Sequence, residues 1–284
     1  MKIKLPILIA VNTYDGHQYC REGFVKNLAQ MQEDSGADVA IFYNGHSPWG
    51  FEKWDKITYE PTPQDTGISI LCAKNNMMRD YFLAGKWSYI FMLESDVVPP
   101  VDCVRKFYGY HQDVVTAIYF INSLRKELVE MPFESKWNIL NRKENGWGDK
   151  EITMPKGEEV MFLAQLYIPT IWGIKNGASS LWRMEDVFPQ RGLVRIFSAG
   201  IGAVLMKRQV LEVCGRFDLR DPSDELQNFT DFLYFRKIHD CGFQAFADTN
   251  TICRHEHFDW DSFVQKRWFD AKTLKAVKAP DVKI

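Results

Sequence analysis

The sequence predicts a doubly wound α/β fold with a mostly parallel central sheet flanked by helices. Apolar runs of strand length alternate with segments of helix length through the first 122 residues. One run, residues 87–93, is apolar at most positions, which is typical of a strand buried on both faces of a parallel sheet. It ends abruptly at Glu94 and Asp96, where open α/β sheets bind their ligands.

The elements of the first half can be placed from periodicity. Leu71, Cys72, Met78 and Phe82 recur at the spacing of a helix. A polar turn is expected at 12–16, after the first strand, and a loop at 61–67. In chain order we expect a strand at 7–11, a helix at 21–33, a strand at 38–43, a helix from 68 to about 82, and strands at 87–93 and 114–120.

Between residues 123 and 195 this alternation stops. A segment of that length without structure is unusual inside a compact domain, so we expect an insertion with short elements of its own. Regular pattern then returns. We expect an apolar run at 197–206, a helix from Asp231, strands at 243–247 and 251–254, and an amphipathic helix at 258–278.

The composition is that of an ordinary globular protein of 284 residues, with a net charge of −2. No basic field is present overall, which argues against a nucleic-acid partner. The six cysteines form no close pairs, so zinc knuckles are not expected and a reducing, cytoplasmic location is the simpler interpretation. The apolar N-terminal stretch is too short to span a membrane. We therefore expect a soluble or peripheral protein.

Glu94 and Asp96 are the first candidate site. Two acids one residue apart point to the same side of an extended chain, and hard carboxylate oxygens suit a divalent cation that carries phosphates. The competing interpretation is a solvated strand end or a helix cap. Asn75 and Arg79 lie four residues apart on one face of the preceding helix, with Lys74 adjacent. This basic, amide-rich helix favours a nucleoside diphosphate with its cation.

Three later features are ambiguous by themselves. Gly200 belongs to a Gly-Ile-Gly segment that indicates either a packing turn or a close backbone approach. Asp231 opens a helix, where an acid is favoured by the dipole, but it could also act as a general base facing a cleft. His255 and His257 follow a buried strand and share one face, which favours at least one metal ligand. His255 is the preferred choice.

Taken in order, these segments resemble the GT-A glycosyltransferases, particularly the large family 2-like group. The resemblance covers roughly residues 5–122 and 196–257. Residues 7–14 resemble the opening strand of the family, and residues 200–208 resemble its acceptor-side glycine segment. Residues 73–79 resemble the Ala-Arg-Asn helix, with Lys74 in place of Arg. Residues 93–96 resemble the Asp-x-Asp motif, with Glu94 in place of the first Asp, and residues 230–232 resemble the Glu-Asp stretch, with Thr230 in place of Glu.

The resemblance implies a GT-A (Rossmann-like) fold and a metal-dependent glycosyltransferase. It implies Mn²⁺ or Mg²⁺ held by Asp96 and His255, with Asp231 as the base of an inverting displacement. A nucleotide-diphosphate sugar would be the donor, and a glycan, lipid-linked or small-molecule hydroxyl the acceptor. The expected donor-binding residues are Asn12, Tyr14, Asn44, Asn75, Arg79, Glu94, Ser95 and Gly200.

We accordingly divide the chain into four parts. They are a nucleotide-sugar-binding half at 1–122, an acceptor-side insertion at 123–195, a catalytic half of the same domain at 196–258, and a helical tail at 259–284. Trp147, Trp172 and Trp182 of the insertion are candidates for stacking on sugars, although packing is the commoner role of Trp. The tail is expected to pack on the main domain, with membrane contact as the less favoured alternative.

Three alternatives remain open from the sequence. A sugar nucleotidyltransferase would carry a Gly-rich basic loop after its first strand. Residues 12–20 contain a single glycine, Gly16, and no basic residue except His17. A non-catalytic nucleotide-sugar-binding protein would use the same Asp96. A retaining transferase would not use Asp231 as a base.

Overall fold

The computed structural model describes residues 4–46, 48–130, 135–143, 146–154, 159–175, 178–182, 184–187, 189–219, 230–256, 268–269 and 276–277. Contacts divide the chain into two units. The first comprises Met1–Ile121 and Ile168–Phe258, and the second Asn122–Tyr167 and Asp259–Ile284. The site described below lies within the first unit.

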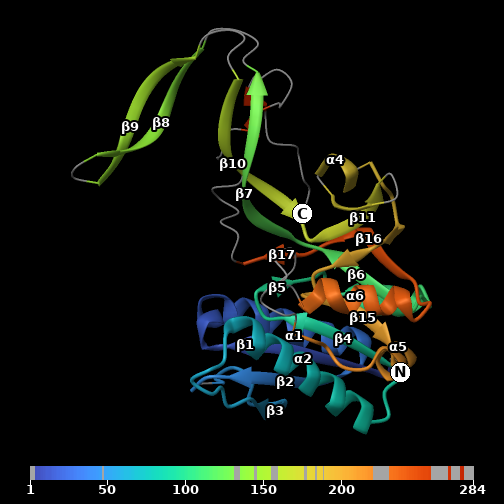
Figure 1. Ribbon diagram of the computed structural model, residues 1–284. Helices are drawn as coiled ribbons and strands as arrows, with labels where there is room; N and C mark the ends of the chain where they lie inside the picture. Colours follow the sequence, from blue (N-terminus) through green and yellow to red (C-terminus); the bar gives the residue numbers. More distant parts are fainter. Residues whose placement is uncertain are drawn as a thin grey trace. The chain divides into compact units, whose positions relative to one another are not determined.

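An eight-stranded sheet forms the centre of the first unit (Figure 1). Its strands, in spatial order, are β13 Leu193–Ile196, β16 Ala245–Ile252, β6 Val114–Ile118, β15 Ala203–Lys207, β4 Tyr89–Glu94, β1 Ile7–Tyr14, β2 Asp38–Asn44 and β3 Asp55–Thr58. Only β15 and β13 run against the others. β1 pairs in parallel with β2 and β4, β2 with β3, and β6 with β16, so the predicted mostly parallel sheet is confirmed.

Helices flank this sheet. α2 begins with a capping box, in which Thr66 and Ser69 satisfy each other's backbone N–H groups. α1 ends at Gly36, whose left-handed φ of 65° closes the helix through a bond to the Gln32 carbonyl. The helices of the first unit are the 3₁₀ helix η1 Asp15–Cys20, then α1 Arg21–Ser35, α2 Gly67–Ala84, α3 Cys103–Gly109, α4 Met184–Val187, α5 Arg208–Cys214 and α6 Thr230–Asp240.

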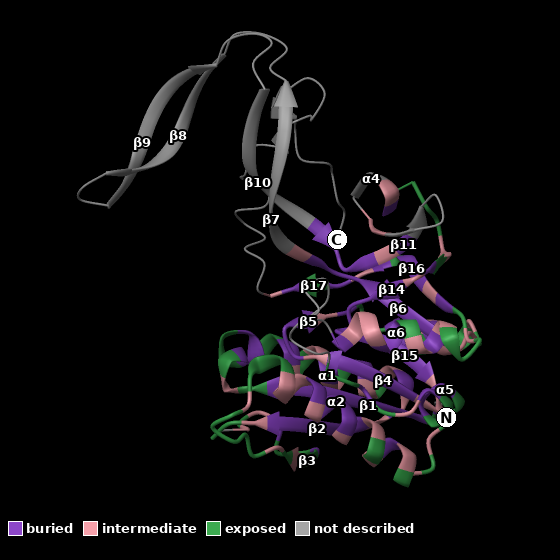
Figure 2. Ribbon diagram, in the orientation of Figure 1, coloured by how far each residue is buried: buried purple, intermediate pink, exposed green. Residues whose placement is uncertain are grey.

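The core lies on both faces of the central strands (Figure 2). One face of β1, made of Ile7, Ile9 and Val11, belongs to a cluster with Phe24 and Leu28 of α1. α2 packs against β1 and β2. Burial of both faces explains why the strands are apolar without alternation.

Some expected boundaries are wrong. The polar residues Asn12–Tyr14 were expected in a turn, but they continue β1 because its ladder with β2 extends to Tyr14 and Asn44. The run at 197–206 is split: β14 Ser198–Ala199 and β15 are separated by a turn at Gly200–Gly202. The two strands expected at 243–254 form the single strand β16 and the short β17 Arg254–His255.

A buried ion pair holds the irregular part of β16. The register of β16 against β6 shifts between Ala247 and Ile252. There Asp248, fully buried, lies 2.6 Å from Lys106 Nζ and accepts from Thr251 Oγ1 at 2.6 Å. Because these bonds satisfy the buried carboxylate, the register of the strand can shift here without leaving an unpaired charge. After this shift the chain continues into β17.

The segment expected as an insertion consists largely of strands. β7 pairs with β10, β8 with β9, and β11 lies between β12 and β14. Their bounds are β7 Phe120–Glu130, β8 Ser135–Lys143, β9 Gly146–Met154, β10 Glu159–Pro169, β11 Ile171–Lys175 and β12 Ala178–Leu181.

The tail differs from the helix expected at 258–278. Trp268–Phe269 (β18) and Ala276–Val277 (β19) pair as antiparallel strands. Trp268, Phe269 and Val277 are aromatic or β-branched, and such residues favour extended backbone. The other residues of the expected helix lie outside the described part of the chain. No helix in that part is long and apolar enough to cross a membrane.

Candidate functional site at the carboxyl edge of the sheet

The carboxyl ends of β1, β2 and β4 meet at one edge because these strands are parallel neighbours. Asn12 stands opposite Glu94 in the ladder, and Tyr14 stands opposite Asn44. Polar residues that are far apart in sequence are therefore gathered where a ligand would bind in an open α/β sheet.

Asp96 and His255 meet next to this edge. β5 Val97–Val98 pairs with β17, so that His255 lies opposite Val97. The backbone N–H of Glu256 donates to the Asp96 carbonyl at 2.7 Å, and His255 Nε2 lies 3.2 Å from Asp96 Oδ2. A pairing of two short strands thus joins side chains that are 159 positions apart in the sequence.

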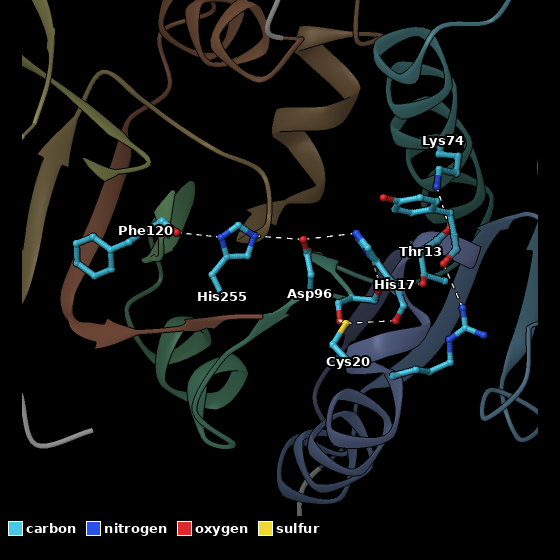
Figure 3. A network of polar contacts seen from close by, with 10 residues as sticks. Thr13, His17, Cys20, Lys74, Asp96, Phe120 and His255 are labelled. Atoms are coloured by element: carbon cyan, nitrogen blue, oxygen red, sulfur yellow. Dashed lines mark hydrogen bonds and ion pairs between the residues drawn. The ribbon is translucent and has the colours of Figure 1, made fainter. Parts of the chain in front are cut away.

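His17 approaches the same carboxylate. Its Nε2 lies 3.5 Å from Asp96 Oδ2, and Figure 3 shows Asp96 between the two imidazoles. The sequence analysis did not place His17 in the site. The available signal was its position in the polar segment that follows the first strand, at the same edge as Glu94.

Hydrogen bonds orient both imidazoles through their second nitrogen. His255 Nδ1 lies 2.9 Å from the Phe120 carbonyl, which can only accept, so this Nδ1 carries a proton. His17 Nδ1 lies 2.7 Å from Ser95 Oγ, whose own hydrogen is donated to Thr13 Oγ1 at 2.7 Å. His17 Nδ1 is therefore also a donor. Each Nε2 can therefore bond to the Asp96 carboxylate when its imidazole carries a second proton, or when another cation lies between them.

Positive charge is favoured at this point. Asp96 and His255 are buried, with exposed fractions of 4% and 8%. Burial by itself lowers the pKa of His255, but the hydrogen bond and charge of Asp96 outweigh it and raise that pKa above its usual value. A buried carboxylate facing imidazole nitrogens would equally favour a metal cation.

The donor chemistry fits a divalent metal ion. Asp96 offers carboxylate oxygen and His255 offers neutral imidazole nitrogen, and both are common ligands. In the part of the chain that the structure describes, no three His, Cys, Asp or Glu side chains form a complete set of metal ligands. Asp96 and His255 would therefore need further ligands, a role that substrate phosphates commonly fill.

Glu94 is the second acid of this edge, and its environment disfavours ionisation. Burial, followed by the charges of Asp96 and Asp231, raises the pKa of Glu94 well above its ordinary value, while Lys74 opposes the shift. Glu94 is thus electrostatically linked to both Asp96 and Asp231.

Asp231 lies in the first turn of α6. Its Oδ2 accepts from the Ile201 backbone N–H at 3.1 Å, and its Oδ1 accepts from Thr230 Oγ1 at 3.2 Å. Burial raises the pKa of Asp231, and these hydrogen bonds only partly offset the effect. A carboxylate whose pKa is raised in this way is a better proton acceptor once it is ionised.

Tyr119 supports the glycine turn that carries Ile201. Its hydroxyl accepts from the Gly202 N–H at 3.2 Å, and a Cβ atom at Gly200 would collide with that hydroxyl. The Tyr119 ring also contacts the His255 ring edge-to-face, at 5.5 Å between centroids. Tyr119 therefore contacts both His255 and the turn that holds Asp231.

Lys74 joins the ends of β1 and β2. Its ammonium donates to the Thr13 carbonyl at 2.9 Å and to Asn44 Oδ1, and it lies 5.9 Å from the centre of the Tyr14 ring. Burial lowers the pKa of Lys74 to about 8, although the charge of Glu94 acts in the opposite direction. Lys74 thus connects Asn44 and Tyr14, two expected donor-binding residues, to the acidic cluster.

The α2 residues expected to bind the donor are placed differently from one another. Arg79 is directed to α5, because its Nε donates to the Leu211 carbonyl at 3.1 Å and its guanidinium pairs with Asp80. The structure therefore does not bring Arg79 to the acids. Asn75 is 1% exposed, and its Nδ2 has no hydrogen-bond partner in the described part of the protein.

Of the other candidates, Trp172 packs edge-to-face on Phe232 at 6.0 Å, and the Trp182 indole lies against Gly173. Trp147 belongs to β9, and nothing further is described of it. His257 lies outside the described residues.

The architecture of this sheet is the GT-A fold. The chain is similar to GalNAc-T7, whose structure was solved with UDP, GalNAc and Mn²⁺, at a TM-score of 0.50 and 8% identity. The match covers 90% of this chain and 44% of that one.

Two other similar structures are the mannosyltransferase PcManGT from Pyrobaculum calidifontis, solved with GDP-Man and Mn²⁺, and S. aureus TarS, solved with UDP-GlcNAc. PcManGT matches at a TM-score of 0.48 and 12% identity, over 88% of this chain and 56% of that one. TarS matches at 0.46 and 10%, over 88% and 58%. The chain thus spans about half the length of these three proteins. No family model matches it, and no curated protein is similar in sequence.

Proposed function

We propose that the protein is a metal-dependent glycosyltransferase that moves a sugar from a nucleotide-diphosphate donor to an acceptor hydroxyl. The observation that carries the proposal is the meeting of Asp96 and His255 at the carboxyl edge of a GT-A sheet, where Glu94 feels the charges of both Asp96 and Asp231. A divalent cation, Mn²⁺ or Mg²⁺, bound there would neutralise the charge that develops on the departing nucleoside diphosphate.

The donor would lie along the ends of β1, β2 and β4. Asn12, Tyr14 and Asn44 would form the nucleoside pocket, with Asn44 held by Lys74. The buried Nδ2 of Asn75 supports a ligand contact on the α2 side. Ser95 would orient His17, because its hydroxyl is already hydrogen-bonded to His17 Nδ1 and to Thr13 Oγ1. Glu94 would face the ribose or the cation through water, and Gly200 would contact the donor through its backbone, because Tyr119 fills the space beside its Cα atom.

Asp231 would take the proton from the attacking hydroxyl in a single inverting displacement. Its raised pKa supports this role because it increases the basicity of the ionised form. The N–H of Ile201 would hold the carboxylate in place. The stereochemistry of the product decides between this mechanism and a retaining one: an inverted anomer supports Asp231 as the base, and a retained anomer removes that role.

A panel of nucleotide sugars tests the function. The full chain is incubated with each donor and with or without Mn²⁺, and both the melting temperature and the release of nucleoside diphosphate are measured. We expect one class of donor to raise the melting temperature only with the metal, and to be turned over. Stabilisation without turnover in the presence of varied acceptors would indicate a binding protein. No stabilisation by any donor or nucleoside diphosphate would overturn the proposal.

A further inference from the structure

Two cysteines meet where α5 and α6 end. Cys214 is the last residue of α5, Cys241 directly follows α6, and the two helices pack against each other (Figure 1). The Cys214 thiol donates to the Lys237 carbonyl at 3.8 Å, and the Cys241 backbone N–H donates to the same oxygen at 2.9 Å. A single carbonyl oxygen therefore brings together two cysteines that are far apart in the sequence.

The two thiols interact with each other but differ in their access to solvent. Burial, followed by a hydrogen bond to the Cys241 thiol and the charge of that thiol, raises the pKa of Cys214 to about 12. Both thiols are free, and Cys214 is buried whereas Cys241 is exposed. An oxidant in solution therefore reaches Cys241 first, and Cys214 stands beside it as the second thiol.

We propose that Cys214 and Cys241 form a reversible disulfide when the protein meets a small-molecule disulfide. In the first exchange, the Cys241 thiolate attacks one sulfur of the oxidant, a mixed disulfide forms, and one small thiol leaves. In the second exchange, the Cys214 sulfur attacks the Cys241 sulfur, and its proton passes to the second small thiol as that thiol leaves. Two protein thiols are thereby oxidised, and one small disulfide is reduced to two thiols.

The bridge would fasten the segment after α5 to α6, where the two are already in contact. The Tyr234 hydroxyl donates to the Gly215 carbonyl at 3.3 Å, and Lys237 Nζ donates to the Arg216 carbonyl at 2.7 Å. Because these bonds hold the segment against α6 before oxidation, the disulfide needs little backbone movement and should stabilise the fold. The closed loop contains Asp231, but the inference does not require the protein to be a transferase.

Oxidation of the full chain tests the disulfide. The protein is incubated with glutathione disulfide and quenched in acid, thiols are counted in denaturant, and peptides are analysed by mass spectrometry. We expect two of the six thiols to disappear, a peptide pair that joins Cys214 to Cys241, and recovery of both thiols with dithiothreitol. In Cys214→Ala, glutathione should remain on Cys241, because the second exchange has no partner. Cys72→Ser is the matched control, since serine keeps the bond to the Phe217 carbonyl.

A glutathione adduct that persists on wild-type Cys241, a disulfide between two copies of the chain, or no loss of thiols would overturn the proposal. The melting temperature provides a second readout. Oxidation should raise it by about 5 °C in the wild type and leave Cys214→Ala and Cys241→Ser unchanged. An oxidised wild type that melts no higher than the reduced protein would also contradict the inference. These measurements need no nucleotide sugar, so their outcome is separate from that of the proposed transferase.

Discussion

Asp96 shows how one residue can depend on distant parts of the chain. Its carboxylate is buried, and His17 and His255 approach it from segments before and after it in the sequence. The sequence pointed to Asp96 and His255 because both follow buried strands. His17 was not foreseen, since a histidine in a polar turn has no periodic signal and only the fold shows that the turn bends back over Asp96.

We expect Asp96→Asn to abolish transfer while the protein still folds. The amide keeps the shape of the side chain but removes the charge that a cation needs, so turnover should fall by at least about a hundredfold. Turnover with added Mn²⁺ and the melting temperature are measured together, with the exposed Asp102→Asn as control. Full activity in the Asp96 variant would contradict the assignment.

Lys74 gives the site a dependence of stability on pH. Its pKa falls from 10.5 to about 8 because of burial, so between these values the unfolded chain binds more protons than the folded one. Stability should therefore rise with pH across this window relative to Lys74→Met, by about 3 kcal/mol at most. Denaturant unfolding of both proteins from pH 7 to 10.5 measures the difference. A flat or falling difference would contradict the burial of a charged Lys74.

At the scale of elements, the glycine turn between β14 and β15 contacts both Tyr119 and Asp231. Its Gly202 N–H donates to the Tyr119 hydroxyl, and its Ile201 N–H donates to the Asp231 carboxylate. The sequence predicts one apolar run at residues 197–206, in which the glycines indicate either a packing turn or a close backbone approach. Periodicity does not reveal the turn, because what requires glycine there is the distant ring of Tyr119, which only the packed sheet brings near.

A double-mutant cycle tests this contact. Gly200→Ala should destabilise the protein strongly, since its methyl group meets the Tyr119 hydroxyl. Tyr119→Phe should cost about 1–3 kcal/mol, because the buried Gly202 N–H loses its acceptor. The two changes should be less than additive, since removing the hydroxyl relieves the collision. Additive free energies of unfolding would show that the contact does not limit residue 200.

At the scale of the whole molecule, the sequence identified the fold better than its boundaries. The strands and helices around the sheet follow from apolar runs that are buried on both faces. The predicted limits of the inserted region, residues 123–195, rest only on the loss of periodicity, because the sequence there has no strong apolar pattern. In the structure, residues Asn122–Tyr167 belong to the second unit, whereas residues 168–181 belong to the unit that contains the sheet.

Excision of residues 122–167 should leave a folded protein. The flanking chain ends are adjacent, because the Thr170 N–H donates to the Tyr119 carbonyl at 3.0 Å, so a Gly-Gly link can join Ile121 to Ile168. We expect a cooperative thermal transition and retained Mn²⁺ binding, with loss of transfer to the acceptor if the excised region selects it. Circular dichroism and metal titration against the full chain measure this. A molten product would show that the sheet unit depends on the excised residues.

The two-residue pairing of β5 with β17 has a consequence for how the protein is made. His17 and Asp96 are synthesised early, but they acquire His255 only when the chain has been extended past β16 and folded back along β5. The affinity for a metal ion would therefore appear only after β17 has been synthesised and has paired with β5. A nascent or shortened polypeptide ending at Cys253 would retain its central strands but would gain little heat resistance from added Mn²⁺, so the metal would discriminate complete copies from incomplete ones.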